Sequence, residues 1–261
     1  MAWLKILGSG PSTAVPMVFN HWKNKNIDKE NPKNNRLRSS FFLSDGDKRL
    51  LVECGPDFSK QVNKYNIPLC GDVFLSHRHQ DHIGGVWEFE NIKKNIGITM
   101  NVYCNMETLE CVKKRFYWMF KDAETCERHR LETKYVNFNI IKPYNIYDDL
   151  FILEVVHGDI HGMGFRYKDF IFTPDMNLLP NESKKYMQNC DLWILQCNNF
   201  VKSDYSLLYH THLDMALEMI EELKPKRAIL THLTDEIDYD NVSKLLPSNV
   251  TLAYDGMEVN F

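Results

Sequence analysis

The sequence lacks the features that mark several classes of protein. It has no Cys-X-X-Cys pair, and its cysteines are scattered at positions 54, 70, 104, 111, 126, 190 and 197. Neither a cysteine-built zinc module nor a disulfide scaffold is therefore expected. No apolar run is long enough to span a bilayer, and there is no internal repeat or low-complexity tract. The formal net charge is only −4, so no overall basicity points to nucleic acid or an anionic membrane.

These absences leave an ordinary globular protein. The chain has 261 residues, of which 44% are hydrophobic and 25% charged, and we expect one domain over residues 1–261. An odd number of scattered cysteines favours reduced thiols and a cytoplasmic protein. The apolar stretch at residues 2–7 is too short for a signal sequence and predicts a first strand.

The apolar pattern predicts short strands and helices along the whole chain. Strands are expected at 2–7, 40–44, 48–53, 73–76, 99–103, 135–141, 151–156, 163–167, 169–173, 191–196, 227–231, 250–254 and 257–261. Helices are expected from Gly55 to about Tyr65 and at 86–94, 182–188, 213–223 and 239–246. Residues 105–134 are charged and helix-prone, with an aromatic run at 116–120 that is either core or a lid. The pattern predicts two sheets packed face to face with helices outside.

A dense group of potential metal ligands follows the apolar run 73–75. His77, His79, Asp81 and His82 fall within six residues. The two histidines that are two residues apart point the same way while the chain is extended. Asp81 and His82 follow as the chain turns into a helix, so they face a second point nearby. This geometry favours two metal ions, because solvated loop histidines, the alternative, seldom reach this density by chance.

Three further ligand-type residues each follow a predicted strand. They are His157, Asp175 and His232, which follow the apolar runs 151–156, 170–174 and 228–231. One such residue is usually a satisfied polar group, but three added to the cluster indicate a shared site. All seven candidates offer nitrogen or oxygen, which suits Zn²⁺, Mn²⁺ or Fe²⁺ without choosing among them.

The His-X-His-X-Asp-His pattern, with a later His, Asp and His, resembles the metallo-β-lactamase superfamily over nearly the whole chain. The resemblance implies an α/β fold, a four-layer αββα sandwich with its site at the edge between the sheets. It also implies two divalent metal ions. One would be held by His77, His79 and His157, the other by Asp81, His82 and His232, and Asp175 would bridge both.

A closer resemblance points to one branch of that superfamily. Residues 8–10, 31–40, 55–58, 157–160 and 253–256 are similar to the branch around phosphoribosyl 1,2-cyclic phosphate phosphodiesterase. His210-Thr211-His212-Leu213 resembles the His-Ser-Thr block of tRNA 3′-end nucleases, with His210 as the matching histidine. His212 is the spare one, which caps or lines the helix start. This branch often forms homodimers, so a homodimer is one expectation.

The chain departs from its relatives at two places. Glu53 stands where the superfamily usually has Asp, so the hydrogen bonds can be similar but the local packing must differ. Residues 8–38 contain no cysteine, whereas the cyclic phosphodiesterase carries a cysteine-bound structural zinc in its N-terminal loop. We therefore expect no zinc in that loop, despite His21.

Residues 16–38, called the arm below, are polar and carry six Lys/Arg against two acids. The arm is either a solvated loop or a source of cations for a phosphate-bearing ligand, with Arg36 and Arg38 as the candidates and His212 as a further substrate contact. Two metals about 3.5–4 Å apart would share a water of lowered pKa that attacks phosphorus. His210, titrating near working pH, is the candidate acid for the leaving oxygen, oriented by Asp81.

The expected function is hydrolysis of a small cyclic or nucleotide-like phosphodiester. A tRNA or RNA 3′-end nuclease is the first alternative, but the chain has no Gly/Pro-rich extended arm to grip tRNA and its net charge is negative. Long nucleic acid is therefore an improbable partner. The second alternative is a non-catalytic metal- or nucleotide-binding protein on the same fold.

Overall fold

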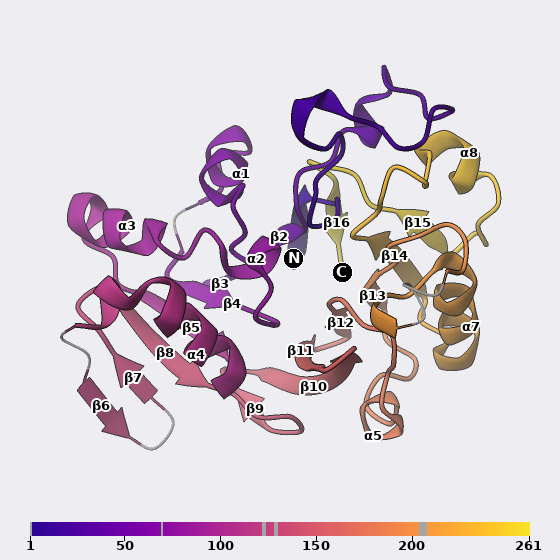
Figure 1. Cartoon of the computed structure of the whole chain (residues 1–261). Coiled ribbons are helices and arrows are strands. Elements are labelled where there is room, and N and C mark those ends of the chain that lie inside the picture. The colour runs from indigo at the N-terminus through magenta and orange to yellow at the C-terminus, as the bar shows by residue number, and fades with distance from the viewer. Residues whose placement is uncertain (1, 69, 122–123, 128–129, 204–207) are drawn as a thin grey trace.

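Two β-sheets face one another at the centre of the molecule (Figure 1). The structure is a computed structural model that describes residues 2–68, 70–121, 124–127, 130–203 and 208–261. None of the described helices combines the length and the apolar character needed to cross a membrane.

The first sheet has nine strands and is built mostly from the N-terminal half. Its spatial order is β16 (Glu258–Asn260), β1 (Trp3–Gly8), β2 (Ser40–Asp45), β3 (Lys48–Val52), β4 (Asp72–Phe74), β5 (Met100–Cys104), β8 (Val136–Ile140), β7 (Arg130–Glu132) and β6 (Glu124–Glu127). Strands β3, β4, β5 and β8 run parallel, so their carboxyl ends share one edge of the sheet.

The second sheet has seven strands and comes from the C-terminal half. Its spatial order is β15 (Val250–Leu252), β14 (Arg227–Thr231), β13 (Leu192–Gln196), β12 (Phe170–Thr173), β11 (Ile160–Tyr167), β10 (Leu150–His157) and β9 (Ile146–Tyr147). Strands β12 to β15 are parallel, which again gathers carboxyl ends at one edge.

Helices cover the outer face of each sheet. They are α1 (Phe58–Lys64), α2 (Gln80–Ile83), α3 (Glu88–Ile96), α4 (Met106–Arg115), α5 (Asn181–Lys184), α7 (Leu213–Leu223) and α8 (Tyr239–Ser243), with short 3₁₀ turns η1 (Val18–Asn20), η2 (Pro32–Asn34) and η3 (Tyr117–Phe120). Phe58, Phe89 and Leu109 pack from α1, α3 and α4 into one core cluster with the first sheet. Helices α7 and α8 pack likewise on the second sheet.

A third cluster lies between the two sheets, where aromatic side chains interlock. The rings of Phe41 and Phe172 are 5.0 Å apart, and those of Phe74 and Phe165 are 4.9 Å apart, in both cases across the sheets. Each buried phenylalanine contributes about 1.5–3 kcal/mol through the apolar surface it removes from water. The expected four-layer αββα sandwich is confirmed.

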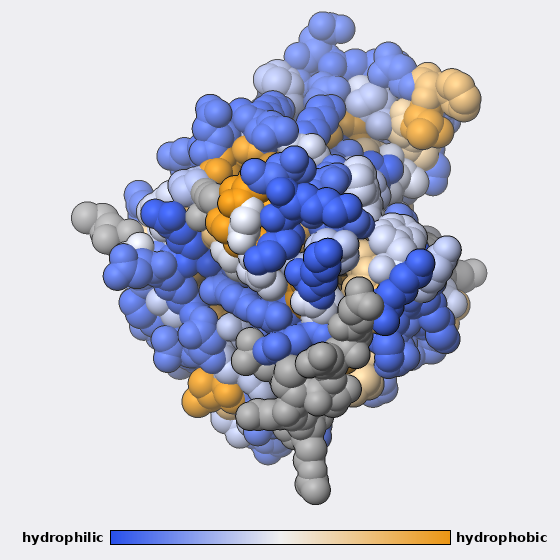
Figure 2. Space-filling model, turned by 90° about the vertical axis from the view of Figure 1, so that its left-hand side faces the viewer, coloured by the Kyte–Doolittle hydropathy of each residue, from blue (hydrophilic) through white to orange (hydrophobic). Residues whose placement is uncertain are grey.

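Two predicted segments differ from the structure. The helix expected at 182–188 is a single turn, α5, and part of the helix-prone segment 105–134 forms β6 and β7 at the edge of the first sheet. The aromatic run ending α4 packs on the outer face of that sheet: Phe116 and Met119 are buried in its cluster, and Phe120 stacks on Phe138. These contacts favour core over lid. The face viewed in Figure 2 is largely hydrophilic, with small separate apolar patches.

Candidate metal centre

The loop after β4 delivers four of the candidate ligands. His77 follows the strand by three residues, and His79 is the extended residue that precedes α2, so Asp81 and His82 lie on the first turn of that helix. The loop packs tightly on Gly55, where a Cβ atom would lie 2.0 Å from the carbonyl oxygen of Asp81. Only glycine permits this approach, which fixes the loop against the end of β3.

The second sheet delivers the remaining ligands at its strand ends. His157 is the last residue of β10, Asp175 lies two residues beyond β12, and His232 directly follows β14. Because β12 and β14 flank β13 in parallel register, their carboxyl ends meet at one edge of the sheet. His210 approaches from the segment that leads into α7.

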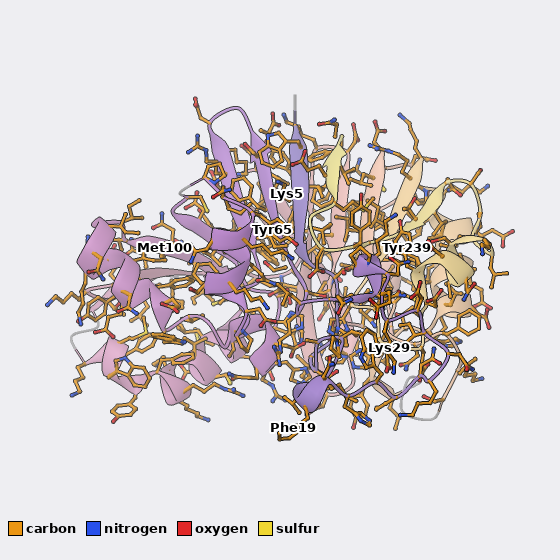
Figure 3. All side chains as sticks on the ribbon, turned by 90° about the horizontal axis from the view of Figure 1, so that it is seen from above. Lys5, Phe19, Lys29, Tyr65, Met100 and Tyr239 are labelled. Atoms are coloured by element: carbon orange, nitrogen blue, oxygen red, sulfur yellow. The ribbon has the colours of Figure 1, made fainter. Side chains whose placement is uncertain are left out.

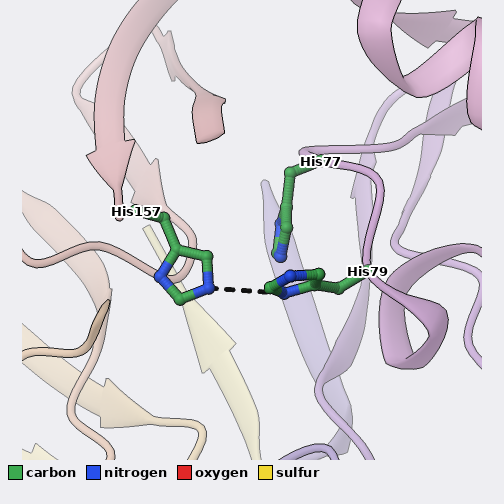
Figure 4. Close-up of side chains that lie close together, drawn as sticks. All are labelled: His77, His79 and His157. Atoms are coloured by element: carbon green, nitrogen blue, oxygen red, sulfur yellow. Dashed lines mark hydrogen bonds between the residues drawn. The ribbon is translucent and has the colours of Figure 1, made fainter. Parts of the chain in front are cut away.

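His77, His79 and His157 form one cluster, called the histidine group below. Their ligand atoms lie within 4.8 Å of one another. His157 Nε2 is 3.3 Å from His79 Nδ1, the contact drawn in Figure 4. His157 Nδ1 donates to the carbonyl of Tyr209, and Ser76 Oγ is 2.9 Å from His77 Nδ1. These contacts hold both rings by Nδ1 and turn their Nε2 atoms inward.

Asp81, His82, Asp175 and His232 form the second cluster, called the carboxylate group below. His82 Nε2 is 3.1 Å from Asp81 Oδ2 and 3.6 Å from Asp175 Oδ2. His232 Nε2 is 3.3 Å and 3.2 Å from the same two oxygens. All four residues are buried. Two imidazoles and two carboxylates thus converge on one point.

Two residues behind the carboxylate group orient its imidazoles. Glu53 Oε1 lies 3.2 Å from His82 Nδ1, while Glu53 Oε2 accepts from the backbone N–H of Ser76 at 3.2 Å. The glutamate adopts a positive φ of 67°. Asn198 Nδ2 lies 3.2 Å from His232 Nδ1, within hydrogen-bond distance. The contact of Glu53 with His82 is the local difference expected from Glu in the place of Asp. The contacts of Asn198 and Tyr209 with ligand histidines were not predicted from the sequence.

The two groups differ in charge. Burial lowers the pKa of His77 well below its usual value, and nearby His82 adds to this effect. Burial alone would lower the pKa of His82 as well, but the carboxylates around it raise that pKa well above its usual value. For Asp81 and Asp175, burial works against ionisation, yet the facing imidazoles hold both pKa values well below the usual range. The two carboxylates of the carboxylate group therefore stay ionised, and His77 in the histidine group stays neutral.

The donor set fits divalent cations. Among the described residues, no group hydrogen-bonds to His77 Nε2, although this atom is fully buried, and His82 Nε2 has no hydrogen-bond partner there either. Buried polar atoms normally have partners. A cation in each group would satisfy these nitrogens, and imidazole with carboxylate is a suitable set for Zn²⁺, Mn²⁺ or Fe²⁺.

His210 lies beside both groups. Its Nδ1 is 3.8 Å from Asp175 Oδ2, and its ring lies 4.7 Å from that of His157 and stacks 5.6 Å from that of His232. Burial lowers the pKa of His210 to about 3, against a partial opposing effect of Asp175. The expected titration near working pH is therefore wrong for the metal-free protein, and Asp175, rather than Asp81, is the carboxylate beside this histidine.

The remaining predicted site residues lie elsewhere. His212 precedes the first turn of α7 and is buried, outside both ligand groups. The structure speaks against Arg36 as a substrate ligand, because its side chain is only 1% exposed and donates to protein oxygens. Arg38 pairs with Asp57 at 3.0 Å and, with Lys60 and Lys64, lines a pocket of about 410 Å³ between the arm and α1.

Comparisons with known proteins agree with this architecture. A diphosphatase of the PhnP family superposes with a TM-score of 0.84 at 23% identity, covering 100% of this chain and 98% of that one. Human short-form tRNase Z superposes with a TM-score of 0.68 at 16% identity, covering 99% and 98%. Zn²⁺-bound PqqB from Methylobacterium extorquens superposes at 0.75 and 16%, covering 99% and 100%. At these identities the likeness shows the shared fold.

One curated relative and one family description complete the comparison. An octanoyltransferase from Porphyromonas gingivalis (strain ATCC BAA-308 / W83) is 26% identical over 255 residues, which are 97% of this chain but 50% of the relative. The chain thus spans about half the length of this relative. Residues 48–233, which carry every candidate ligand, match the family described as "Beta-lactamase superfamily domain". The chain belongs to the β-lactamase superfamily of metal-dependent hydrolase folds.

Proposed function

We propose that the chain is a dinuclear metal-dependent phosphodiesterase that hydrolyses small cyclic or nucleotide-like phosphodiesters. The position of Asp175 carries this proposal. Its carboxylate belongs to the carboxylate group and also lies in a set with His157 and His210, whose ligand atoms are within 4.8 Å of one another. One carboxylate thus stands between two ligand groups, with a further histidine beside it. The diphosphatase and tRNase Z structures, whose names denote phosphorus–oxygen bond cleavage, support this reaction class.

The histidine group would hold one metal, the carboxylate group the other, and Asp175 both. Bound there, two divalent cations such as Zn²⁺, Mn²⁺ or Fe²⁺ would lower the pKa of a shared water and neutralise charge on a phosphoryl group. The chain would fix the positions of both metals, because Tyr209, Glu53 and Asn198 contact the imidazoles from behind.

His210 would donate the proton to the leaving oxygen. In the free protein this imidazole is neutral, because burial lowers its pKa to about 3. A bound phosphodiester anion would favour the protonated form, since an adjacent negative charge raises the pKa of a histidine. The acid form would therefore arise in the complex with substrate. Asp175, 3.8 Å away, would stabilise the imidazolium.

Arg38 is the cation in the arm that we propose for substrate binding. It is partly exposed, and it faces a pocket in which Lys60 and Lys64 add positive charge. Arg38→Met should raise KM several-fold and leave kcat near its original value, whereas Lys29→Met, which removes an exposed arm charge elsewhere, should change neither. An unchanged KM in Arg38→Met would remove the arm from substrate binding.

The decisive experiment is turnover by metal-loaded protein. Bis(p-nitrophenyl) phosphate and a panel of cyclic and linear phosphodiesters would be assayed with Zn²⁺ or Mn²⁺. We expect Asp175→Ala to lower kcat/KM by at least about 10³-fold and His210→Gln to lower kcat by about 10²-fold. His161→Gln, a change at an exposed histidine, is the matched control. Circular dichroism would show that each variant is folded.

Two further substrates separate the alternatives. Cleavage of a precursor tRNA with no turnover of small phosphodiesters would replace the proposal by RNA processing. Hydrolysis of p-nitrophenyl octanoate alone would favour an acyl substrate, which the name of the P. gingivalis relative raises. Metal binding without any turnover would favour a binding protein.

We place the reaction in the cytoplasm, because the described cysteines are free thiols, as a reducing compartment would keep them.

A further inference from the structure

The arm holds a buried arginine whose partners lie almost two hundred residues away. Arg36 Nη1 donates to the carbonyl oxygens of Thr234 at 2.7 Å and Leu233 at 3.4 Å, and Nη2 donates to that of Ile237 at 2.7 Å. The remaining contacts, to Lys33 and Asn34, stay within the arm. Every partner is a neutral oxygen, so the guanidinium is placed to bind a piece of backbone.

That piece of backbone directly follows His232 of the carboxylate group. His232 has a φ of 64°, a left-handed conformation that residues other than glycine rarely adopt. The chain therefore turns at a candidate ligand, directly before the residues whose carbonyls Arg36 binds. Leu233 and Ile237 are fully buried, so water does not satisfy their carbonyls in place of Arg36, whereas the carbonyl of half-buried Thr234 also accepts from the N–H of Ile237 at 3.2 Å.

The rest of the arm also hydrogen-bonds to the segment that follows His232. Asp235 accepts from the backbone N–H groups of Lys23 at 2.5 Å and Asn24 at 3.1 Å, and Asp238 accepts from Asp28 N at 3.1 Å and Asn34 Nδ2 at 2.8 Å. In Figure 1 the arm lies beside α8, and Figure 3 places Lys29 of the arm on the same side as Tyr239 of that helix. These hydrogen bonds thus hold the arm against residues 233–239.

From these contacts we infer that Arg36 is a positioning residue for the metal site. By binding the carbonyls of Leu233, Thr234 and Ile237, it holds the turn that aims His232 Nε2 at Asp81 and Asp175. Losing the guanidinium would take away the partner that Arg36 gives to the buried carbonyls of Leu233 and Ile237, leave Thr234 with only the N–H of Ile237, and let the turn relax towards a commoner φ. His232 would then move away from the carboxylate group, whereas His77, His79 and His157, which sit on other elements, would stay in place. The inference rests on the two ligand groups of the proposed function and not on its substrate.

The test is metal binding to the intact chain, freed of metal and titrated with Co²⁺. His77→Ala and His232→Ala would supply reference visible spectra, each with one ligand group impaired. In Arg36→Met we expect cobalt at the carboxylate group to bind about 10- to 100-fold more weakly, as is usual when the support of a ligand is lost, while the histidine group keeps its affinity within threefold. Lys29→Met, an exposed arm cation, should bind both metals normally.

A general loss of structure would look different. Equal weakening at both groups, or normal binding at both in folded Arg36→Met, would overturn the inference. If Arg36→Met does not fold, Arg36→Lys decides: its single ammonium cannot reach residue 234 and residue 237 together, so we expect selective weakening of about tenfold, and unchanged binding would overturn the inference. A chain that binds both metals but cleaves no phosphodiester would disprove the proposed function and leave the role of Arg36 intact.

Discussion

The two ligand groups lie at one edge of the same sandwich and offer opposite electrostatics. The histidine group presents three imidazoles and no carboxylate of its own, and burial lowers the pKa values of His77 and His79. The carboxylate group presents two carboxylates that their imidazole neighbours keep ionised. A divalent cation in the first group would share one carboxylate, that of Asp175, whereas one in the second group would face the carboxylates of both Asp81 and Asp175 and be neutralised more fully. We infer that the first group supplies Lewis acidity and the second supplies retention of metal.

The difference also appears behind the ligands. The histidine group is oriented by neutral oxygens, those of Ser76 and Tyr209, whereas His82 in the carboxylate group is oriented by the carboxylate of Glu53. A charged partner at ion-pair distance favours the protonated form of an imidazole more than a neutral one does and raises its basicity. The partners behind the histidine group are therefore neutral, whereas the partner behind His82, next to the two carboxylates, is charged.

Removing the shared carboxylate should have the largest effect. Asp175 belongs to the carboxylate group and also lies within 4.8 Å of His157 of the histidine group, whereas Asp81 belongs to the carboxylate group alone. We expect Asp175→Ala to bind neither metal tightly and to lose at least about 10³-fold in kcat/KM. Asp81→Ala should keep the metal of the histidine group. Metal analysis after gel filtration measures the stoichiometry, and equal stoichiometry in the two variants would show that Asp175 serves one group alone.

Breaking one group at a time should change which metal the protein prefers. His77→Ala leaves the carboxylate group, rich in oxygen ligands, and His232→Ala leaves the histidine group, which has only nitrogen ligands. Imidazole favours Zn²⁺, while carboxylate also suits Mn²⁺. The ratio of Zn²⁺ affinity to Mn²⁺ affinity should thus be at least about tenfold smaller in His77→Ala than in His232→Ala. Competition with a chromophoric chelator gives both affinities, with His161→Ala as control. Identical ratios would contradict the contrast between the groups.

The orienting residues should show the same contrast on a smaller scale. Glu53→Gln keeps the size of the side chain but removes the charge behind His82, so we expect about tenfold weaker metal binding at the carboxylate group. Ser76→Ala removes only a neutral hydroxyl behind His77 and should weaken the histidine group less. Both affinities come from the same chelator competition. If Ser76→Ala proves the more damaging change, charge in the orienting residue is not what matters.

Much of the site could be predicted from the sequence, because its ligands are side chains at strand ends. Apolar runs mark the strands, and the ligand-type residue that follows each run marks the edge where parallel strands meet. The support of the ligands could not be predicted in this way. His157 is held by the backbone carbonyl of Tyr209, which carries no sequence signal, and Arg36 looks like any other cation of a basic loop until its partners, nearly two hundred residues away, are known.

Prediction of the fold from the sequence has the same limit, because long-range partners carry no local signal. Helix α7 occupies the predicted residues 213–223, because its apolar spacing is set by one face packed on the second sheet. Residues 124–127 and 130–132, in a charged segment predicted as helix-prone, instead pair as β6 and β7 at the open edge of the first sheet. Pairing with β8 stabilises the strand conformation in this segment, and a scale of local propensity takes no account of a partner strand.

The carboxylate of Asp255, outside the metal site, tests what the imidazoles contribute. Asp255 accepts from the N–H and hydroxyl of Ser9, both at 2.8 Å, and from the N–H of Leu37 at 2.7 Å, and no histidine faces it in these contacts. Burial raises the pKa of Asp255 to about 6, with these hydrogen bonds opposing the shift. For the carboxylates of the metal site, the facing imidazoles outweigh burial and lower the pKa values. At Asp255 hydrogen bonds without an imidazole do not outweigh burial.

This difference predicts a pH dependence of stability. Between the ordinary pKa of 3.8 and the folded value of about 6, the folded state holds a proton that the unfolded state has released, so the free energy of unfolding falls as the pH rises through this window. From pH 5 to pH 7.5 the loss due to Asp255 is about 1 kcal/mol. Asp255→Asn should lack this part of the slope, although it is less stable at every pH because its amide nitrogen faces the N–H of Leu37. Urea unfolding of metal-free protein at both pH values measures the slope, with the exposed Asp240→Asn as control. An Asp255→Asn slope equal to that of the unchanged chain would mean that the carboxylate is already ionised at pH 5, and that hydrogen bonds from Ser9 and Leu37 alone can hold this carboxylate charged without the imidazoles that the metal site employs.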